Sequence, residues 1–368
     1  MKRNAPMITT TLGRYFAGKF IATVLAVFTG VYLLVLVVDF IELSRRLSDA
    51  ASATTPVIAL TSFYHVPQII ERLTPFGILV AAMVSFLALS RRLELVVARA
   101  AGISAWQFIS PALVSALVIG ALATTAYNPF SATAQERASR MEAQLFGDRS
   151  RSLQNASGYW INQITSEGQA ILNAANSQSQ GTRLAGLTIF RLDTSNRFLE
   201  RIEATEATLE DGYWRLKNVR HYRLNEQVFV EDTFLLKTSL TREQVRESFV
   251  QPDAVSFWQL PEYIASSINA GTATSGYRYQ YHKLLAQPFM LIAMVMLASA
   301  VSLRFFRLGG VQIMVLSGVG AGFLLYVLSK VTEDLAKAEV MHPIAAAWLP
   351  ICMGGLAGFL ALLYQEDG

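Results

Sequence analysis

The chain has 368 residues, of which 52% are hydrophobic and 16% are charged, against roughly 25% charged residues in an ordinary soluble domain. This composition excludes an ordinary two-domain soluble enzyme. The formal net charge of +4 fits a membrane protein with basic residues beside its spans better than a nucleic-acid-binding protein. The only cysteine, Cys352, excludes a disulfide framework and a cysteine-based zinc site.

Six long apolar stretches follow one another along the chain. Most approach the ~20 residues that a helix needs to cross the hydrocarbon of a bilayer. The first is too long for a removable signal peptide and lacks a small-residue cleavage site, so we interpret it as a permanent span. The second is short, and we expect it to borrow a turn from residues 69–73. The stretches are residues 15–40, 74–90, 106–127, 284–303, 311–329 and 343–364.

A polar block between the third and fourth stretches divides the spans three and three. The sequence therefore predicts an α-helical membrane protein with six transmembrane helices and one large extramembrane insertion. We assign residues 1–127 to the first transmembrane half, 128–256 to the inserted domain, 257–283 to a connecting helix and hinge, and 284–368 to the second half.

The inserted block has the pattern of strands. Short segments rich in β-branched and aromatic residues alternate with turn signals, and Asp211-Gly212 is a two-residue hairpin signal. Many short strands without a helical period predict an all-β sandwich or open jelly roll. The expected strands lie at 158–164, 170–173, 186–191, 213–218, 221–224, 227–230 and 233–238.

Three further elements are predicted around this domain. Apolar residues at helical spacing in 257–270 predict the connecting helix, and the small, polar tract 271–276 predicts the hinge. Thr55-Pro56 predicts the start of a short amphipathic helix that lies outside the membrane before the second span.

Basic residues beside the spans predict the orientation. Nine lie on one side and five in the short loops on the other, so the positive-inside rule places the nine in the cytoplasm. Both termini are then cytoplasmic, and the polar block lies on the far side of the membrane. The nine are Lys2, Arg3, Arg14, Lys19, Arg91, Arg92, Arg99, Arg304 and Arg307; the five are Arg45, Arg46, Arg72, Lys330 and Lys337.

Motifs for catalysis are incomplete. A G-x-x-x-x-G-K pattern ends at Lys19, but Phe20 follows where a phosphate loop needs Ser or Thr. The four histidines are scattered, so we expect no catalytic site, no metal site and no cofactor. Glycine pairs at Gly318/Gly322 and Gly354/Gly358 let helices approach closely, equally well within one chain or between subunits.

The loop after the second span predicts a short amphipathic helix. As a helix, residues 91–102 place Leu93, Val96, Val97 and Ala100 on one face, with Glu94 beside it. Such a helix fits two roles equally: a connector on the membrane surface, or a segment that docks into a groove of a cytoplasmic partner.

A set of residues in fixed order carries a family resemblance over nearly the whole chain. Together they resemble the LptF/LptG permease family, and its LptG branch more than its LptF branch. They are Arg14-Tyr15, Gly18-Lys19, Val66-Pro67, Pro75, Arg92-Leu93-Glu94-Leu95-Val96-Val97, Ala101-Gly102, Gln251-Pro252-Asp253-Ala254-Val255-Ser256, Tyr277-Arg278-Tyr279-Gln280 and Gln287-Pro288.

The resemblance implies a subunit of an ABC-type lipopolysaccharide exporter in the inner membrane of a Gram-negative bacterium. Such a permease pairs with an LptF-like permease and sits on a cytoplasmic LptB-like ATPase dimer, so it is not itself an enzyme. It extracts lipopolysaccharide from the membrane and passes it through its periplasmic jelly roll to a bridge of LptC-like and LptA-like proteins.

The resemblance also implies site residues. The loop helix is the family's coupling helix, with Arg91, Arg92, Leu93, Glu94 and Val97 toward the ATPase and Glu94 as its acidic residue. Two lysines of the family's lipid site are replaced here, by Asp39 and Gln68. The candidates for binding lipopolysaccharide phosphates are Arg45, Arg46, Arg72, Arg137 and Arg140.

Four alternatives stay open. An arginine pair at a helix end also fits snorkelling to lipid headgroups, and the chain also fits the paralogous LptF-type subunit or a force-transmitting membrane protein. A secondary transporter places ionisable residues near the bilayer midplane, and the middles of these spans are nearly free of charge.

Overall fold

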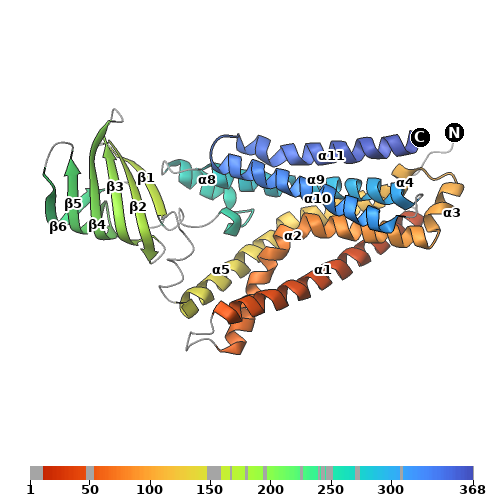
Figure 1. The fold of residues 1–368 in the computed structure, drawn as a ribbon, viewed down its shortest axis with the longest axis horizontal. Coiled ribbons are helices and arrows are strands. Elements are labelled where there is room, and N and C mark those ends of the chain that lie inside the picture. The colour runs from red at the N-terminus through yellow and green to blue at the C-terminus, as the bar shows by residue number, and fades with distance from the viewer. Residues whose placement is uncertain are drawn as a thin grey trace.

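A computed structural model describes residues 11–46, 54–146, 159–165, 168–178, 181–193, 197–223, 227–238, 241, 245, 252–269, 274–306 and 310–367. Long helices form a bundle, and a β-sheet lies beyond one end of it (Figure 1). The start of the first helix and the end of the last lie at the opposite end (Figure 1). We call the end with the sheet the β-domain side and the opposite end the loop side.

Within the described residues, six helices are long and apolar enough to cross a membrane, which confirms the three-plus-three plan. α1 (Thr11–Arg46), α2 (Thr55–Arg91) and α4 (Ala105–Leu122) precede the sheet. α9 (Ser275–Phe306), α10 (Val311–Lys337) and α11 (Pro343–Asp367) follow it. Large apolar side chains along α1 and α10 are exposed, so these two helices need lipid or another chain around them.

Helix α2 runs unbroken from Thr55 to Arg91, so the predicted separate short helix before the second span is wrong. The predicted start at Thr55-Pro56 is off by one residue at the cap: Thr54 is the N-cap, without a side-chain capping hydrogen bond, and Pro56 lies in the first turn, where its missing N–H is not needed. The helix continues because its first half packs against other helices, with Val66 and Ile70 buried. Tertiary packing thus joins two segments that the sequence predicted as separate helices into one helix.

The third span continues far past Tyr127. A π-helical segment, Ala123–Tyr127, joins α4 to α5 (Asn128–Phe146), so residues assigned to the β domain begin as helix. Thr124 donates a hydrogen bond to the Leu284 carbonyl at 2.9 Å, and the Tyr127 hydroxyl donates to the Pro67 carbonyl at 3.0 Å. These bonds fix the π-helical segment between α9 and α2.

Between Tyr159 and Lys237, the described part of the inserted domain is all-β, as predicted. Its described strands pair antiparallel, each with the next, in the order β1 to β6. This order is a meander of hairpins, without the crossovers of a jelly roll. The predicted turn Asp211-Gly212 joins two of them, with Gly212 at a φ of 87°. The strands are β1 (Tyr159–Thr165), β2 (Gly168–Gln178), β3 (Arg183–Leu192), β4 (Phe198–Glu210), β5 (Tyr213–Arg223) and β6 (Phe229–Lys237).

Strand β4 was missed by the sequence analysis because Glu and Ala, which are rare in strands, fill it. Its buried face carries Ile202, Ala204, Ala207 and Leu209, which pack in one core with Trp214 of β5. Alternation of small or apolar residues with glutamates was the signal for this strand.

A buried polar cluster joins β3, β4 and β5. Glu200 lies 2.6 Å from the Arg191 guanidinium, and His221 and Arg223 each approach its other oxygen at 3.1 Å. Burial acts to raise the pKa of Glu200, but hydrogen bonds from these three groups outweigh it and hold that pKa below its usual range. Glu200 is therefore an ionised, structural countercharge.

After the sheet, η3 (Pro252–Ala254) and α8 (Leu260–Asn269) lead back to the bundle. The predicted connecting helix starts three residues later than expected. Residues 271–273 of the predicted hinge lie outside the described residues, whereas Ser275 and Gly276 begin α9. The fourth span therefore starts before residue 284.

The glycine pairs contact helices of the same chain. A Cβ added at Gly322 of α10 would meet Leu79 of α2 at 2.9 Å, and one at Gly358 of α11 would meet Met296 of α9 at 2.9 Å. These close approaches favour packing within one chain as the role of both pairs.

Candidate functional site

The loop between α2 and α4, at the loop side of the bundle, turns the chain sharply. α2 ends at Arg91, and Leu93 then adopts a left-handed φ of 60°. Because this conformation interrupts a right-handed helix, the loop helix α3 (Glu94–Ala100) is shorter than the predicted 91–102. Gly102, at a φ of 80°, turns the chain again before α4.

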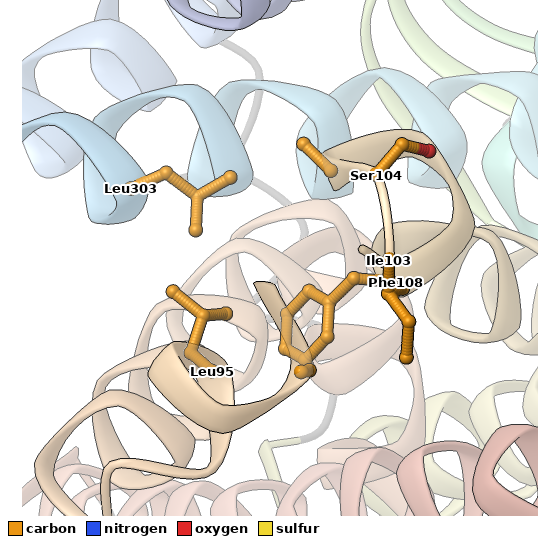
Figure 2. Close-up of a pocket in the computed structure, with 7 residues that line it drawn as sticks. Leu95, Ile103, Ser104, Phe108 and Leu303 are labelled. Carbon is orange, nitrogen blue, oxygen red and sulfur yellow. The ribbon is translucent and has the colours of Figure 1, made fainter. Parts of the chain in front are cut away.

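The inner face of α3 rests on the bundle. Figure 2 shows Leu95 of α3, Phe108 of α4 and Leu303 of α9 around a narrow apolar crevice. Leu95 and Ala98 are the buried residues of this face. The sequence analysis missed this pair, although its i, i+3 spacing marks one face of a helix.

The outer face of α3 has no cover within the described chain. Leu93 is 57% exposed and Val97 is 68% exposed, and both Arg91 and Arg92 are exposed beside them. The loop therefore offers a small apolar centre with a basic edge.

Glu94, the first residue of α3, turns inward. Its Oε1 atom lies 2.5 Å from the Lys19 ammonium of α1, and the Tyr15 hydroxyl donates to the same oxygen at 3.2 Å. The side chains of Lys19 and Glu94 are only 27% and 24% exposed. One oxygen of a carboxylate predicted to face a partner protein thus has its partners within the chain, whereas its buried Oε2 atom has no hydrogen-bond partner among the described residues.

The arginine pair at the end of α1 lies on the β-domain side. Arg45 and Arg46 both contact Glu42 of the same helix, at 2.9 Å and 2.8 Å. Both guanidinium groups are exposed, so they remain accessible to an anion.

Arg72 of α2 lies against the segment that follows the sheet. Its guanidinium is 3.4 Å from an Asp253 carboxylate oxygen, and Gln68 donates to the Asp253 carbonyl at 3.3 Å. Gln68, which replaces a lysine of the family pattern, is thus a buried contact between α2 and this segment.

The arginines of α5 complete the candidate set. The Arg137 guanidinium lies over the Tyr64 ring of α2, 5.7 Å from its centroid, and Arg140 pairs with Glu136 of its own helix at 2.5 Å. Asp39 of α1, at the position of another family lysine, lies 2.7 Å from a ring nitrogen of His65.

The five candidate arginines thus lie on three helices, α1, α2 and α5, on the β-domain side. Four of them have a carboxylate of the same chain within 4 Å. Exposed pairs of this kind contribute only about 0–1 kcal/mol. A multiply charged anion can therefore replace such a carboxylate at small cost. Among the residues that the structure describes, no three His, Cys, Asp or Glu side chains could hold a metal ion.

Comparison with known proteins gives one family. Residues 14–364 match the family model for the lipopolysaccharide export system permease LptF/LptG. The chain belongs to the LptF/LptG permease family. It is 22% identical over 348 residues to the lipopolysaccharide export system permease protein LptG of Haemophilus influenzae, covering 91% of this chain and 92% of that one. It is 23% identical over 349 residues to LptG of Escherichia coli K12, covering 92% and 94%.

This member of the LptF/LptG family is a multi-pass membrane protein, a permease for lipopolysaccharide export. Sequence analysis missed the roles of Tyr15 and Lys19 beside Glu94. A signal was available, because Tyr15 and Lys19 are four residues apart on one helix face. Glu94 is also the only acidic residue between Arg91 and Gly102.

Proposed function

We propose that the chain is the LptG-type permease subunit of an ATP-driven lipopolysaccharide exporter in the inner membrane of a Gram-negative bacterium. The observation that carries this proposal is the family match over nearly the whole chain, together with six spans divided by a β domain. Relatives named LptG favour this subunit over its LptF-type paralogue.

In this proposal a separate, LptB-like ATPase dimer hydrolyses ATP, and the permease itself is not an enzyme. The ATPase docks on the outer face of α3, where Leu93 and Val97 supply apolar contact and Arg91 and Arg92 supply charge. A groove with an apolar floor and an acidic rim complements this face.

Lipopolysaccharide carries phosphate groups at the water–lipid boundary, and in this proposal the five arginines on the β-domain side lie at the same boundary. Arginine binds phosphate through two parallel hydrogen bonds, and each charge-assisted contact contributes about 1.5–3 kcal/mol. The proposed lipid-binding residues are therefore Arg45, Arg46, Arg72, Arg137 and Arg140.

The remaining partners occupy surfaces that the fold leaves open. The exposed apolar faces of α1 and α10 support a heterodimer with an LptF-like permease, with lipid between the subunits. The β domain is then periplasmic and passes the lipid to a bridge of LptC-like and LptA-like proteins.

The proposal is tested by co-expressing the chain with its LptF-like and LptB-like partners and purifying the complex. Lipopolysaccharide should copurify, and Val97→Asp should lower the recovered ATPase about tenfold, because it buries a charge in an apolar contact. Val340→Asp is the matched control, because this valine is also highly exposed but follows α10 on the β-domain side. Full ATPase recovery with Val97→Asp, or a complex without lipopolysaccharide, would contradict the proposal.

A further inference from the structure

Lys19 and Glu94 form a contact between a membrane span and the loop helix. The two residues are 75 positions apart, and they join α1 to the first residue of α3. The Lys19 ammonium also lies over the Tyr15 ring, 4.5 Å from its centroid. Three interactions therefore meet at one carboxylate oxygen and its lysine: an ion pair, a hydroxyl hydrogen bond and a cation–π contact.

Burial makes this pair different from an ordinary surface ion pair. About three quarters of each side chain is covered, so water and salt screen the attraction less than at an exposed site. A lysine near a membrane boundary can instead extend toward the headgroups. Here the ammonium points to Glu94, at 2.5 Å.

Among the side chains that the structure describes, few other contacts restrain the orientation of helix α3. It has seven residues, and Leu93 and Gly102, both at positive φ, precede and follow it. Its buried contacts are Leu95 and Ala98, which line the apolar crevice of Figure 2. Apolar packing has no preferred direction, so it tolerates rotation that an ion pair opposes.

Helix α1 is itself held mainly near this end. Its buried residues on the loop side are Gly13, Phe16, Phe20 and Val24, and Phe16 meets Phe108 of α4 edge to face at 4.7 Å. Beyond Val24, the next buried residue of α1 is Leu43. Lys19 therefore lies in the part of α1 with most of its buried residues, whereas beyond Val24 the helix is mostly exposed or partly buried, with Leu43 buried and Asp39 beside His65.

We infer that Lys19 is a positioning residue, which fixes the orientation of α3 through Glu94 and links it to α1. One consequence, and only this one, rests on the proposed function. When lipid or the partner permease displaces α1, the Lys19–Glu94 pair transmits the displacement to the ATPase-docking face of α3. Because Glu94 is paired with Lys19, its negative charge does not offset the positive charges of Arg91 and Arg92 on the docking face.

The link between α1 and α3 can be measured in the full chain alone, in lipid nanodiscs. Spin labels at Leu12→Cys and Val97→Cys, both exposed, in a Cys352→Ser background report the distance from α1 to α3. Lys19→Met should broaden the distance distribution and raise the population of displaced α3 about fivefold, as expected for loss of one ion pair. Glu94→Gln should do the same, and the double variant should add little further.

Two variants separate positioning from general damage. The exchanged pair Lys19→Glu with Glu94→Lys should narrow the distribution again, because the attraction is restored. Arg14→Met removes a cation from the same exposed end of α1 and should leave the distribution unchanged. An unchanged distribution in Lys19→Met, or equal broadening in Arg14→Met, would overturn the inference.

The consequence for transport is tested separately in the complex with its ATPase. Lys19→Met should lower the stimulation of ATP hydrolysis by lipopolysaccharide about fivefold while the ATPase stays bound, and the exchanged pair should recover it. If the distances change as expected but no ATPase binds the unsubstituted chain, the positioning role of Lys19 stands and the proposed function fails. Unchanged distances with normal ATPase binding would overturn the positioning role alone.

Discussion

The two ends of the helix bundle hold their polar groups in different ways. On the β-domain side, Asn128 is 1% exposed and bridges two elements: it donates to the Glu71 carboxylate at 2.7 Å and accepts the Phe257 N–H at 2.7 Å. Nearby, Thr124 and Tyr127 bind the carbonyls of α9 and α2. Residues 124–128 thus join the helix on which they lie to α2, to α9 and to the segment at Phe257.

A second cluster strengthens the same side. Glu333 of α10 is buried and lies within 4 Å of three ammonium groups, those of Lys283 of α9 and of Lys330 and Lys337 of α10. Fully paired buried networks fix one arrangement of the groups that they join.

Among the residues that the structure describes, the loop side depends on fewer directional contacts. The ion pair of Lys19 and Glu94 and a capping box at Ser104 hold the loop, above an apolar crevice. The contrast indicates that the described contacts fix the spans to one another on the β-domain side more firmly than they fix the loop helix. On the proposed function, such an arrangement would let the loop follow a separate ATPase.

The largest effect is expected at Asn128. Asn128→Ala leaves the Glu71 carboxylate and the partly buried Phe257 N–H without this partner, at a cost of about 2–5 kcal/mol, because each unsatisfied buried group costs about 1–3 kcal/mol and a charged one costs more. The apparent melting temperature of the purified chain, followed by scanning fluorimetry, should fall clearly. Thr133→Ala is the control: Thr133 is exposed and bonds only its own helix, to the Phe130 carbonyl. Equal melting temperatures for the two variants would show that Asn128 does not fix the β-domain side, which would contradict the difference between the two ends of the bundle.

Much of this architecture follows from the sequence. The six spans, their division by a β domain and the Asp211-Gly212 turn depend on local composition, which the sequence displays directly. Strand β4 was missed because its glutamates and alanines favour helix locally, and only pairing with β3 and β5 makes them a strand.

The candidate site was less predictable. The sequence analysis placed Leu93 and Val97 on one face of the loop. It did not predict the partner of Glu94, because Lys19 lies 75 residues away. The basic helix ends were foreseen as charges, yet their carboxylate partners, such as Asp253 beside Arg72, come from segments that only the fold brings together. No local pattern encodes such contacts.

An intermediate effect is expected from close helix packing. A Cβ at Gly120 of α4 would lie 2.5 Å from the Pro288 Cα of α9, a backbone atom that cannot move away easily, whereas a Cβ at Gly18 of α1 meets nothing within 4 Å. Gly120→Ala should therefore destabilise the chain by about 1–3 kcal/mol through overpacking. Gly18→Ala should be neutral or stabilise it by about 0.5–1 kcal/mol, since alanine is the better helix former. Melting temperatures that move in the same direction would show that the loop side is packed as tightly as the β-domain side.

The smallest effect is expected at the start of α4. Ser104 accepts the Gln107 N–H at 3.2 Å, and the Gln107 side chain accepts the Ser104 N–H at 3.2 Å, so the two residues satisfy two N–H groups at the helix start. Ser104→Ala removes one of these bonds and should cost about 1 kcal/mol, as for other N-caps. Because the loop joins α4 here, faster amide hydrogen exchange should be confined to the loop and the first turn of α4. Ser110→Ala in the same helix loses only a bond from its hydroxyl to the Gln107 carbonyl and should leave exchange in the loop unchanged. If Ser104→Ala accelerated exchange around Asn128 as well, the two ends would unfold together, and the loop could not move independently of the junction on the β-domain side.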